Sequence, residues 1–490
     1  MALRRLLLLG LALGGSGGLA HAAPQPAIDV VAAPAWKGWS RPGRTTEIDV
    51  RLNADSATRA TLDLVAGRQT VHTDFDLQPG RGLRLQMPVS AAATIVLSAG
   101  PAAGPQQRRE LGIAQSESPL LGVGLASGEQ VTLEGFHSIA LAADDLPRNA
   151  AAYSSIDALI VDAATLGALD QRQLSALLEH AAGCGRVVVL NTDPRLRRVL
   201  EGARGCGGQA LMSAASPAAA KEMLEASLAA SQPAPMAPGA LAELARPDRA
   251  VWNQVAVALA VYLAVAALAI MFFSSFALTL LVPVLACLAF VALLQVLPAP
   301  SQLVVWSEGE SGAPQARYAA WQRFQGVARE RRRVPMPPQL ASSAQPCGTG
   351  PALAFDFDAR SARMTSVEFD TRLFRQVALC YSGTFPMSRA LAIEKHAAGV
   401  QEVRNAGTKA LPAGVLLAAG RVHHLPALDP GARVTLVAQS GKPPRSAALR
   451  TAAARAPADG VAALWELELG GVASVPADSK GWLLVSVPVP

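Results

Sequence analysis

Hydrophobic and polar positions change their rhythm along the chain, and the first rhythm is an alternation. Stretches such as TTEIDVRL and RATLDLVAG alternate apolar and polar residues, with turn sequences such as RPGR and QPGRG between them. A period of two is typical of half-buried strands, and several short strands at this spacing predict a sandwich. We therefore expect an immunoglobulin-like β-sandwich over residues 24–117.

A second region, residues 118–232, replaces alternation with continuous apolar runs and helical patterns. IDALIVD and RVVVLN are typical of buried parallel strands. Between them, DQRQLSALLEHAAGCG places Leu174, Leu177 and Leu178 at helical spacing. Strand–helix alternation predicts a small α/β domain with a parallel sheet. A Pro- and Ala-rich linker follows over residues 233–250.

A long apolar run, residues 251–298, contains no charged side chain. As one helix it would measure about 70 Å, against a hydrocarbon core of about 30 Å. The polar pair SS near its middle predicts a turn, and hence two transmembrane helices over about 252–273 and 276–297. These spans contain no charge, and Thr279 and Gln295 add little polarity to them, so we expect anchors rather than a transport path.

The last region, residues 299–490, returns to alternation. ALAFDFD, TSVEFD and AALWELEL are among its strand-like stretches and predict a C-terminal all-β region of one or two sandwiches. Taken together, the patterns predict a multidomain α+β membrane protein with a two-helix transmembrane hairpin.

The first 22 residues have the pattern of a secretory signal peptide. Arg4 and Arg5 precede an apolar stretch, and AHA supplies an A-x-A cleavage site. With two spans returning the chain to the same side, both large regions are expected in the periplasm. The expected location is the bacterial inner membrane, with the lipid bilayer as one partner.

Composition changes this picture little. Charged residues are 16% and apolar residues 51% of the chain, and the net charge is +6. Basic residues are scattered, except in ARERRRV at residues 328–334. A solvated strand face is the favoured interpretation of that run, with anionic lipid or an acidic partner as alternatives. No nucleic-acid partner is expected.

The cysteines suggest disulfides rather than metal or redox chemistry, because no C-x-x-C motif occurs. Cys287 lies in the apolar run, where it is expected to be a small buried hydrophobe. The others form two local pairs, Cys184 with Cys206 and Cys347 with Cys380. Such pairs can close in an oxidising compartment.

Candidate ligand-binding residues follow the buried strands of the α/β region. Asp162 ends one such strand, and Asn191, Thr192 and Asp193 follow the next. Open α/β sheets bind ligands at this edge, although plain helix capping explains the same residue types. No catalytic residue, metal site or cofactor is predicted.

Three stretches carry a resemblance: WKGWSRPGRTTEIDVRL, YSSIDALIVDAATLGALDQRQLSALLEHAAGCGRVVVLN and VRNAGTKALPAGVLLAAGRVHHLPALDPGARVTL. They resemble bacterial envelope proteins in which a β-sandwich precedes a class I glutamine amidotransferase-like domain and transmembrane helices. The middle stretch also looks like amidotransferase-like domains found beside gliding-type transporters and MoxR/von Willebrand A systems. That family places a cysteine nucleophile in a G-x-C-x-G turn after a strand. Here GCG, at residues 183–185, comes before a strand, so the resemblance implies a fold without its catalysis.

The sequence thus predicts a non-enzymatic inner-membrane protein that displays interaction domains in the periplasm. Its partners would be other envelope proteins, for which it would act as a scaffold or accessory subunit. One alternative is a periplasmic amidotransferase-like or hydrolase enzyme. Another is an accessory subunit of a membrane transporter.

Overall fold

The N-terminal sandwich is built from both ends of the chain. The computed structural model describes residues 27–191, 211–229, 236–245 and, with short gaps, 301–487, with three isolated positions between 264 and 271. One sheet of the sandwich has the order β1-β3-β6, and the other has the order β17-β20-β19-β5-β4-β7-β8. The bounds are, for the first, Ile28–Pro34, Thr45–Ala54 and Leu83–Ser90 and, for the second, Glu330–Pro335, Arg363–Thr371, Leu353–Asp358, Gln69–Leu77, Thr58–Ala66, Thr94–Pro101 and Gln107–Gly112.

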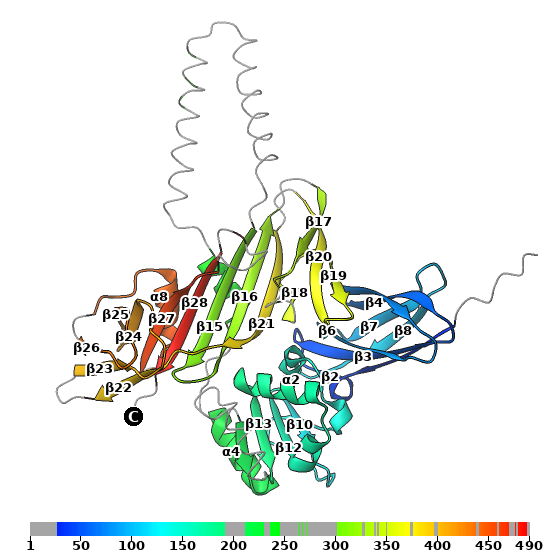
Figure 1. Cartoon of the computed structure of the whole chain (residues 1–490), viewed down its shortest axis with the longest axis horizontal. Helices are drawn as coiled ribbons and strands as arrows, with labels where there is room; N and C mark the ends of the chain where they lie inside the picture. Colours follow the sequence, from blue (N-terminus) through cyan, green and yellow to red (C-terminus); the bar gives the residue numbers. More distant parts are fainter. Residues whose placement is uncertain are drawn as a thin grey trace, which may run out of the picture.

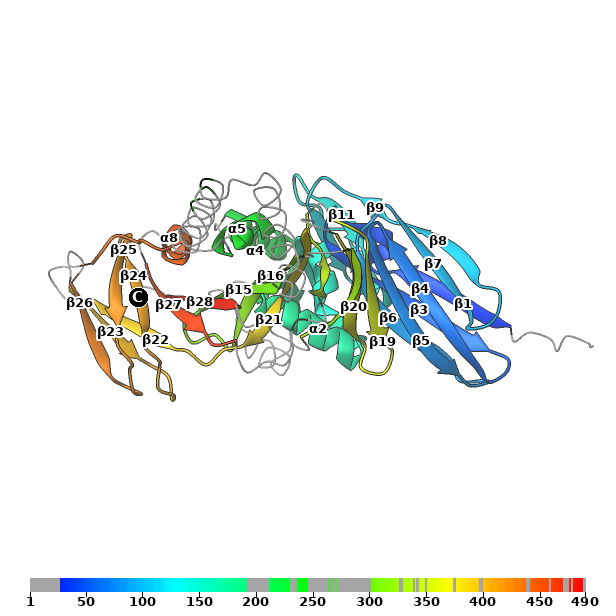
Figure 2. The ribbon, with the colours of Figure 1, turned by 90° about the horizontal axis from the view of Figure 1, so that it is seen from above.

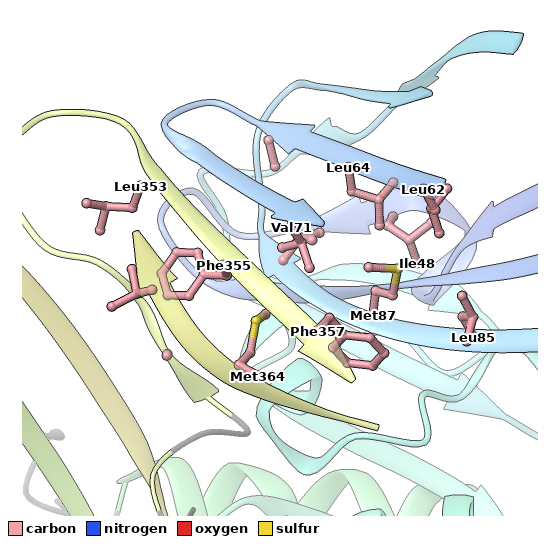
Figure 3. Close-up of a cluster of buried hydrophobic side chains, with 14 of the residues drawn as sticks. Ile48, Leu62, Leu64, Val71, Leu85, Met87, Leu353, Phe355, Phe357 and Met364 are labelled. Atoms are coloured by element: carbon pink, nitrogen blue, oxygen red, sulfur yellow. The ribbon is translucent and has the colours of Figure 1, made fainter. Parts of the chain in front are cut away.

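A parallel seam joins the N-terminal and C-terminal strands of the larger sheet. β19 pairs with β5, so that Phe355 lies opposite Val71 and Asp356 lies opposite His72. Phe355 and Phe357 point from β19 into the same core as Val71 and Met87 (Figure 3). Residues predicted as separate regions thus share one sheet and one hydrophobic core.

The α/β domain is a five-stranded parallel sheet in the order β11-β10-β12-β13-β14. Buried apolar side chains of β12 and β13 fill both faces of the sheet, as their continuous apolar sequences require. The strands are His137–Ala140, Leu120–Gly124, Ala158–Asp162, Arg186–Leu190 and Leu211–Ala214, with helices η2 Ala143–Asp145, η3 Ala150–Ser155, α1 Ala163–Gly167, α2 Gln171–Ala182 and α4 Pro217–Ala229.

The remaining C-terminal strands form an eight-stranded sheet and a three-stranded sheet. The larger has the order β18-β21-β16-β15-β28-β27-β24-β25, and the smaller has the order β22-β23-β26. The bounds are Gln345–Pro346, Gln376–Pro386, Gln315–Gln325, Ser301–Glu310, Lys480–Val487, Val461–Leu467, Gly414–Ala418 and Arg421–Leu425, then Leu391–Lys395, Val400–Asn405 and Arg433–Val437.

Two short helices, α5 (Pro238–Leu244) and α8 (Ala447–Arg455), lie on one side of the eight-stranded sheet (Figure 2). A short 3-10 helix, η1 (Trp36–Gly38), and strand β2 (Trp39–Ser40) lie between β1 and β3 in the chain, and Trp36 is buried in the core of the α/β domain. β2 pairs in parallel with β9 (Ala114–Gln115), which precedes the first strand of that domain.

The predicted fold class, an α+β membrane protein with a transmembrane hairpin, is wrong. Most described residues in regular structure are in strands, and the part of the chain that the structure describes holds no helix long and apolar enough to cross a bilayer. The predicted spans 252–273 and 276–297 fall outside the described residues, apart from three positions. An apolar sequence requires only that its side chains be kept from water, and packing against protein meets that requirement as a bilayer does.

Candidate functional site

The carboxyl edge of the α/β sheet has the topology at which such sheets bind ligands. β10 is flanked by β11 on one side and β12 on the other, so the connection from β10 to β11 and the connection from β11 to β12 run in opposite directions across the sheet. Such a switch point opens a crevice between the carboxyl ends of the two strands. Here those ends are Gly124 on β10 and Asp162 on β12.

Asp162 forms structural hydrogen bonds at this edge. One carboxylate oxygen accepts from the Thr165 N–H at 2.7 Å and caps α1, and the other accepts from the Ala126 N–H at 2.8 Å. Burial disfavours the charged form of Asp162, but the hydrogen bonds from Thr165 and Ala126 outweigh it and lower the pKa of the carboxyl. The residue is therefore a carboxylate at neutral pH, with each oxygen bonded to a backbone N–H.

The structure brings one further predicted residue to the same edge. Leu190 lies opposite Asp162 in the sheet, and Asn191 follows directly. Asn191 is exposed, has a φ of 54°, and donates its N–H to the Ala214 carbonyl at 3.2 Å. Its backbone thus ends the strand in the left-handed region that asparagine tolerates. Thr192 and Asp193 lie outside the described residues.

The loop after β10 contains a hydroxyl, Ser127, but its surroundings are those of a turn. Its Oγ accepts from the Glu129 N–H at 3.3 Å within the same loop. Within the described residues, no three His, Cys, Asp or Glu side chains come together as a possible metal site. Ser127 and Glu129 of this loop and Asn191 at the end of β13 are exposed at this edge.

A buried polar contact between the sandwich and the α/β domain was not predicted from the sequence. Glu47 on β3 is 2% exposed, and both of its oxygens accept from the Arg148 N–H at 3.1 Å. Burial raises the pKa of Glu47 to about 7, against the opposing effect of the backbone N–H groups of Arg148 and Asn149. The alternation of apolar and polar residues in β3 places Glu47 on the outer face of the sandwich. The sequence of β3 does not indicate that another domain covers this face.

Aromatic rings extend this contact. Tyr153 of η3 is fully buried, with Trp36 edge-on at 5.1 Å and the His180 imidazole stacked at 5.0 Å between ring centroids. The Trp36 indole N–H donates to the Ala152 carbonyl at 3.0 Å. Burial lowers the pKa of His180 to about 4, so its ring is neutral at physiological pH. Gly185 covers the imidazole, and a Cβ there would lie 2.0 Å from Nε2.

One predicted disulfide is present and the other is described at one end only. Cys347 and Cys380 are bonded, with their Cα atoms 5.5 Å apart, and join the segment after β18 to β21. Cys184 takes part in a disulfide, whereas its predicted partner Cys206 lies outside the described residues.

The eight-stranded sheet carries a half-buried ion network beside a small cavity. Glu308 accepts from Arg317 at 2.6 Å and from the Nη2 of Arg455 at 2.9 Å, and it also accepts from the Trp306 indole at 2.8 Å. Burial raises the pKa of Glu308, but the two guanidinium groups outweigh it, and the pKa is lowered. The adjoining cavity of about 20 Å³ has room for water and little else. The network therefore fastens α8 to the sheet.

Comparison with known proteins adds no functional assignment. No family model matches the chain, and no curated protein matches it. Among solved structures, one similar chain is a β-glucosidase, EmGH1 from Erythrobacter marinus, at 16% identity and a TM-score of 0.14. The match covers 18% of this chain and 16% of the glucosidase chain. A similarity of this size carries no argument about fold or activity.

Proposed function

We propose that this protein is a non-enzymatic interaction protein that presents its α/β domain to partner proteins of the cell envelope. The observation that carries the proposal is that the Asp162 carboxylate is occupied by structural hydrogen bonds. At the switch point, where open α/β sheets bind ligands, both carboxylate oxygens accept from backbone N–H groups. What remains at this edge is an exposed surface of loops, including Ser127, Glu129 and Asn191.

An oxidising location is part of this proposal. The Cys347–Cys380 disulfide supports it, because such bonds persist outside the reducing cytosol. The alternative is an amidotransferase-like or hydrolytic enzyme that uses the same edge. Ser127 is the hydroxyl of the β10 loop, and this alternative would assign it as the nucleophile.

Photocrosslinking of the full-length protein tests the proposal. A photoreactive amino acid is placed at Glu129, in the exposed loop after β10, and in the control at Val65, which is 37% exposed on the sandwich. We expect the same identified envelope proteins to be crosslinked repeatedly from position 129 and not from position 65. Equal patterns from both positions, or no adducts, would count against the proposal.

An activity measurement separates the enzymatic alternative. The wild-type protein and the Ser127→Ala variant are assayed for ammonia release from glutamine and for hydrolysis of small amides and esters. We expect the two proteins to be equally inactive. Turnover that disappears in Ser127→Ala would overturn the non-enzymatic function.

A further inference from the structure

The seven-stranded sheet ends in an exposed basic strand, β17. Among the described strands β17 pairs only with β20 and so forms one margin of the sheet (Figure 1). Its sequence, ERRRVP, follows an exposed arginine at position 329. An edge strand presents half of its backbone N–H and C=O groups to the outside, and the chemistry of this edge decides what can pair with it.

The hydrogen bonds of β17 show which backbone groups face outward. The Met336 N–H donates to the Thr365 carbonyl of β20 at 2.9 Å. Along an antiparallel strand, the backbone N–H and C=O groups of successive residues point to opposite sides. The backbone groups of Arg331, Arg333 and Pro335 therefore point away from β20. Pro335 has no N–H to offer, and a proline is tolerated at an outward position of an edge strand. The free edge therefore consists of the N–H and C=O groups of Arg331 and Arg333, followed by one further carbonyl.

The side chains of β17 already pair with acidic groups on the inner side. Asp370 and Glu368 of β20 lie opposite Arg331 and Arg333. Arg331 forms an ion pair with Glu368, and Arg333 forms one with Asp356 at 2.7 Å. Both arginine side chains remain largely exposed, at 75% and 65%. An acidic strand is thus the kind of neighbour that this strand accepts within its own chain.

We propose that the outer edge of β17 accepts an extended acidic segment of a partner protein as an additional strand. Backbone hydrogen bonds to Arg331 and Arg333 would supply the pairing, and their guanidinium groups would select carboxylates on the added strand. The same charges repel the β17 edge of a second copy of the chain, which is how charged edges prevent self-association. The inference rests on the proposed interaction function and names the class of partner.

Fluorescence anisotropy with the full-length protein tests this inference. The probe is a labelled seven-residue peptide of alternating Glu and Thr, and the matched control peptide alternates Lys and Thr. We expect binding of the acidic peptide alone. A second acidic peptide, methylated on alternate backbone nitrogens, should bind at least about fivefold more weakly, because it loses hydrogen bonds to the edge.

Two substitutions at one position separate charge from backbone pairing. Arg333→Gln removes a charge and should weaken binding of the acidic peptide by about two- to fivefold. Arg333→Pro also removes the outward N–H but no backbone bond to β20, and should weaken peptide binding by about a further fivefold. Both substitutions remove the side-chain bond from Arg333 to Ser366 of β20, so the comparison between them isolates the N–H. Arg59→Gln, at an arginine 69% exposed on β4, should leave binding unchanged.

The outcomes distinguish strand addition from other uses of the basic edge. If Arg333→Pro and Arg333→Gln weaken binding equally and methylation has no effect, only charge is recognised and the inference fails. If vesicles with anionic lipid bind through these arginines while the acidic peptide does not, the edge is a lipid contact and the inference also fails. In either case, adducts formed from position 129 would leave the proposed function standing.

Discussion

Glu47 and His180 should give the contact between the sandwich and the α/β domain two opposing responses to pH. The pKa of Glu47 rises from 4.5 to about 7 on folding, so its stabilising contribution is complete below pH 4.5 and is lost as the pH rises through 7. The pKa of His180 falls from 6.5 to about 4, so its contribution is complete above pH 6.5 and is lost as the pH falls through 4. Each difference corresponds to about 3 kcal/mol of unfolding free energy.

The two pH windows overlap between about pH 4.5 and 6.5. In that range the loss of unfolding free energy from Glu47 with rising pH is offset by the gain from His180, so the stability of the wild-type protein changes little. Glu47→Gln keeps an acceptor oxygen for the Arg148 N–H but removes the titration. Relative to wild type, its unfolding free energy should increase by about 3 kcal/mol from pH 4.5 to 7. His180→Gln should lose about 3 kcal/mol relative to wild type from pH 4 to 6.5.

Native-state hydrogen exchange measures these changes where they arise. The amides of Ala152 and Ile156 belong to the η3 segment and donate to the Asn149 and Tyr153 carbonyls, so their exchange reports opening of this contact. Between pH 4.5 and 6.5, the double variant of Glu47 and His180 should have the pH profile of the wild type. A constant difference between Glu47→Gln and wild type from pH 4.5 to 7 would refute the reasoning, because Glu47 would then titrate alike in both states.

Two substitutions test packing, one at the seam between β19 and β5 and one beside the buried His180 ring. Phe355→Ala should lower the unfolding free energy by about 3–5 kcal/mol. In hydrogen exchange it should also deprotect amides of β5 around Val71. Loss of amide protection confined to the C-terminal strands would show that the seam does not transmit stability. Gly185→Ala should cost about 1–3 kcal/mol, because its Cβ would meet the His180 ring. Gly167→Ala, with no atom within 4 Å of the added Cβ, is the control. Equal loss of stability in both variants during thermal unfolding would show that the contact with His180 is not the cause.

How much could be predicted from the sequence depends on how local the signal is. Alternation located β3, β4, β19 and β20, because the two-residue period of a strand is visible in the strand's own residues. The parallel pairing of β19 with β5 joins residues almost 300 positions apart. The sequence of neither strand indicates which strand it pairs with. The sequence therefore predicted strands in both end regions but could not show that they share a sheet.

The candidate site divides in the same way. Asp162 was recognisable because a strand end and a helix N-cap are neighbours in sequence, and its bond to Thr165 is local. Its second bond, to the Ala126 N–H, depends on how β10 and β12 align. That tertiary bond could not be predicted from the sequence. The bond to Thr165 agrees with helix capping, and ligand binding by Asp162 stays a prediction.

The contacts of the α/β domain decide how a partner bound there would act. On one side Glu47 of β3 accepts from the Arg148 N–H. On another side Thr384 of β21 donates to Glu179 of α2 at 3.4 Å. β3 belongs to the sandwich and β21 to the eight-stranded sheet, and the sandwich itself contains C-terminal strands. The domain is therefore held from two sides by elements that are themselves joined. Force or binding at its exposed carboxyl edge would act on the whole assembly of sheets rather than on a hinged arm.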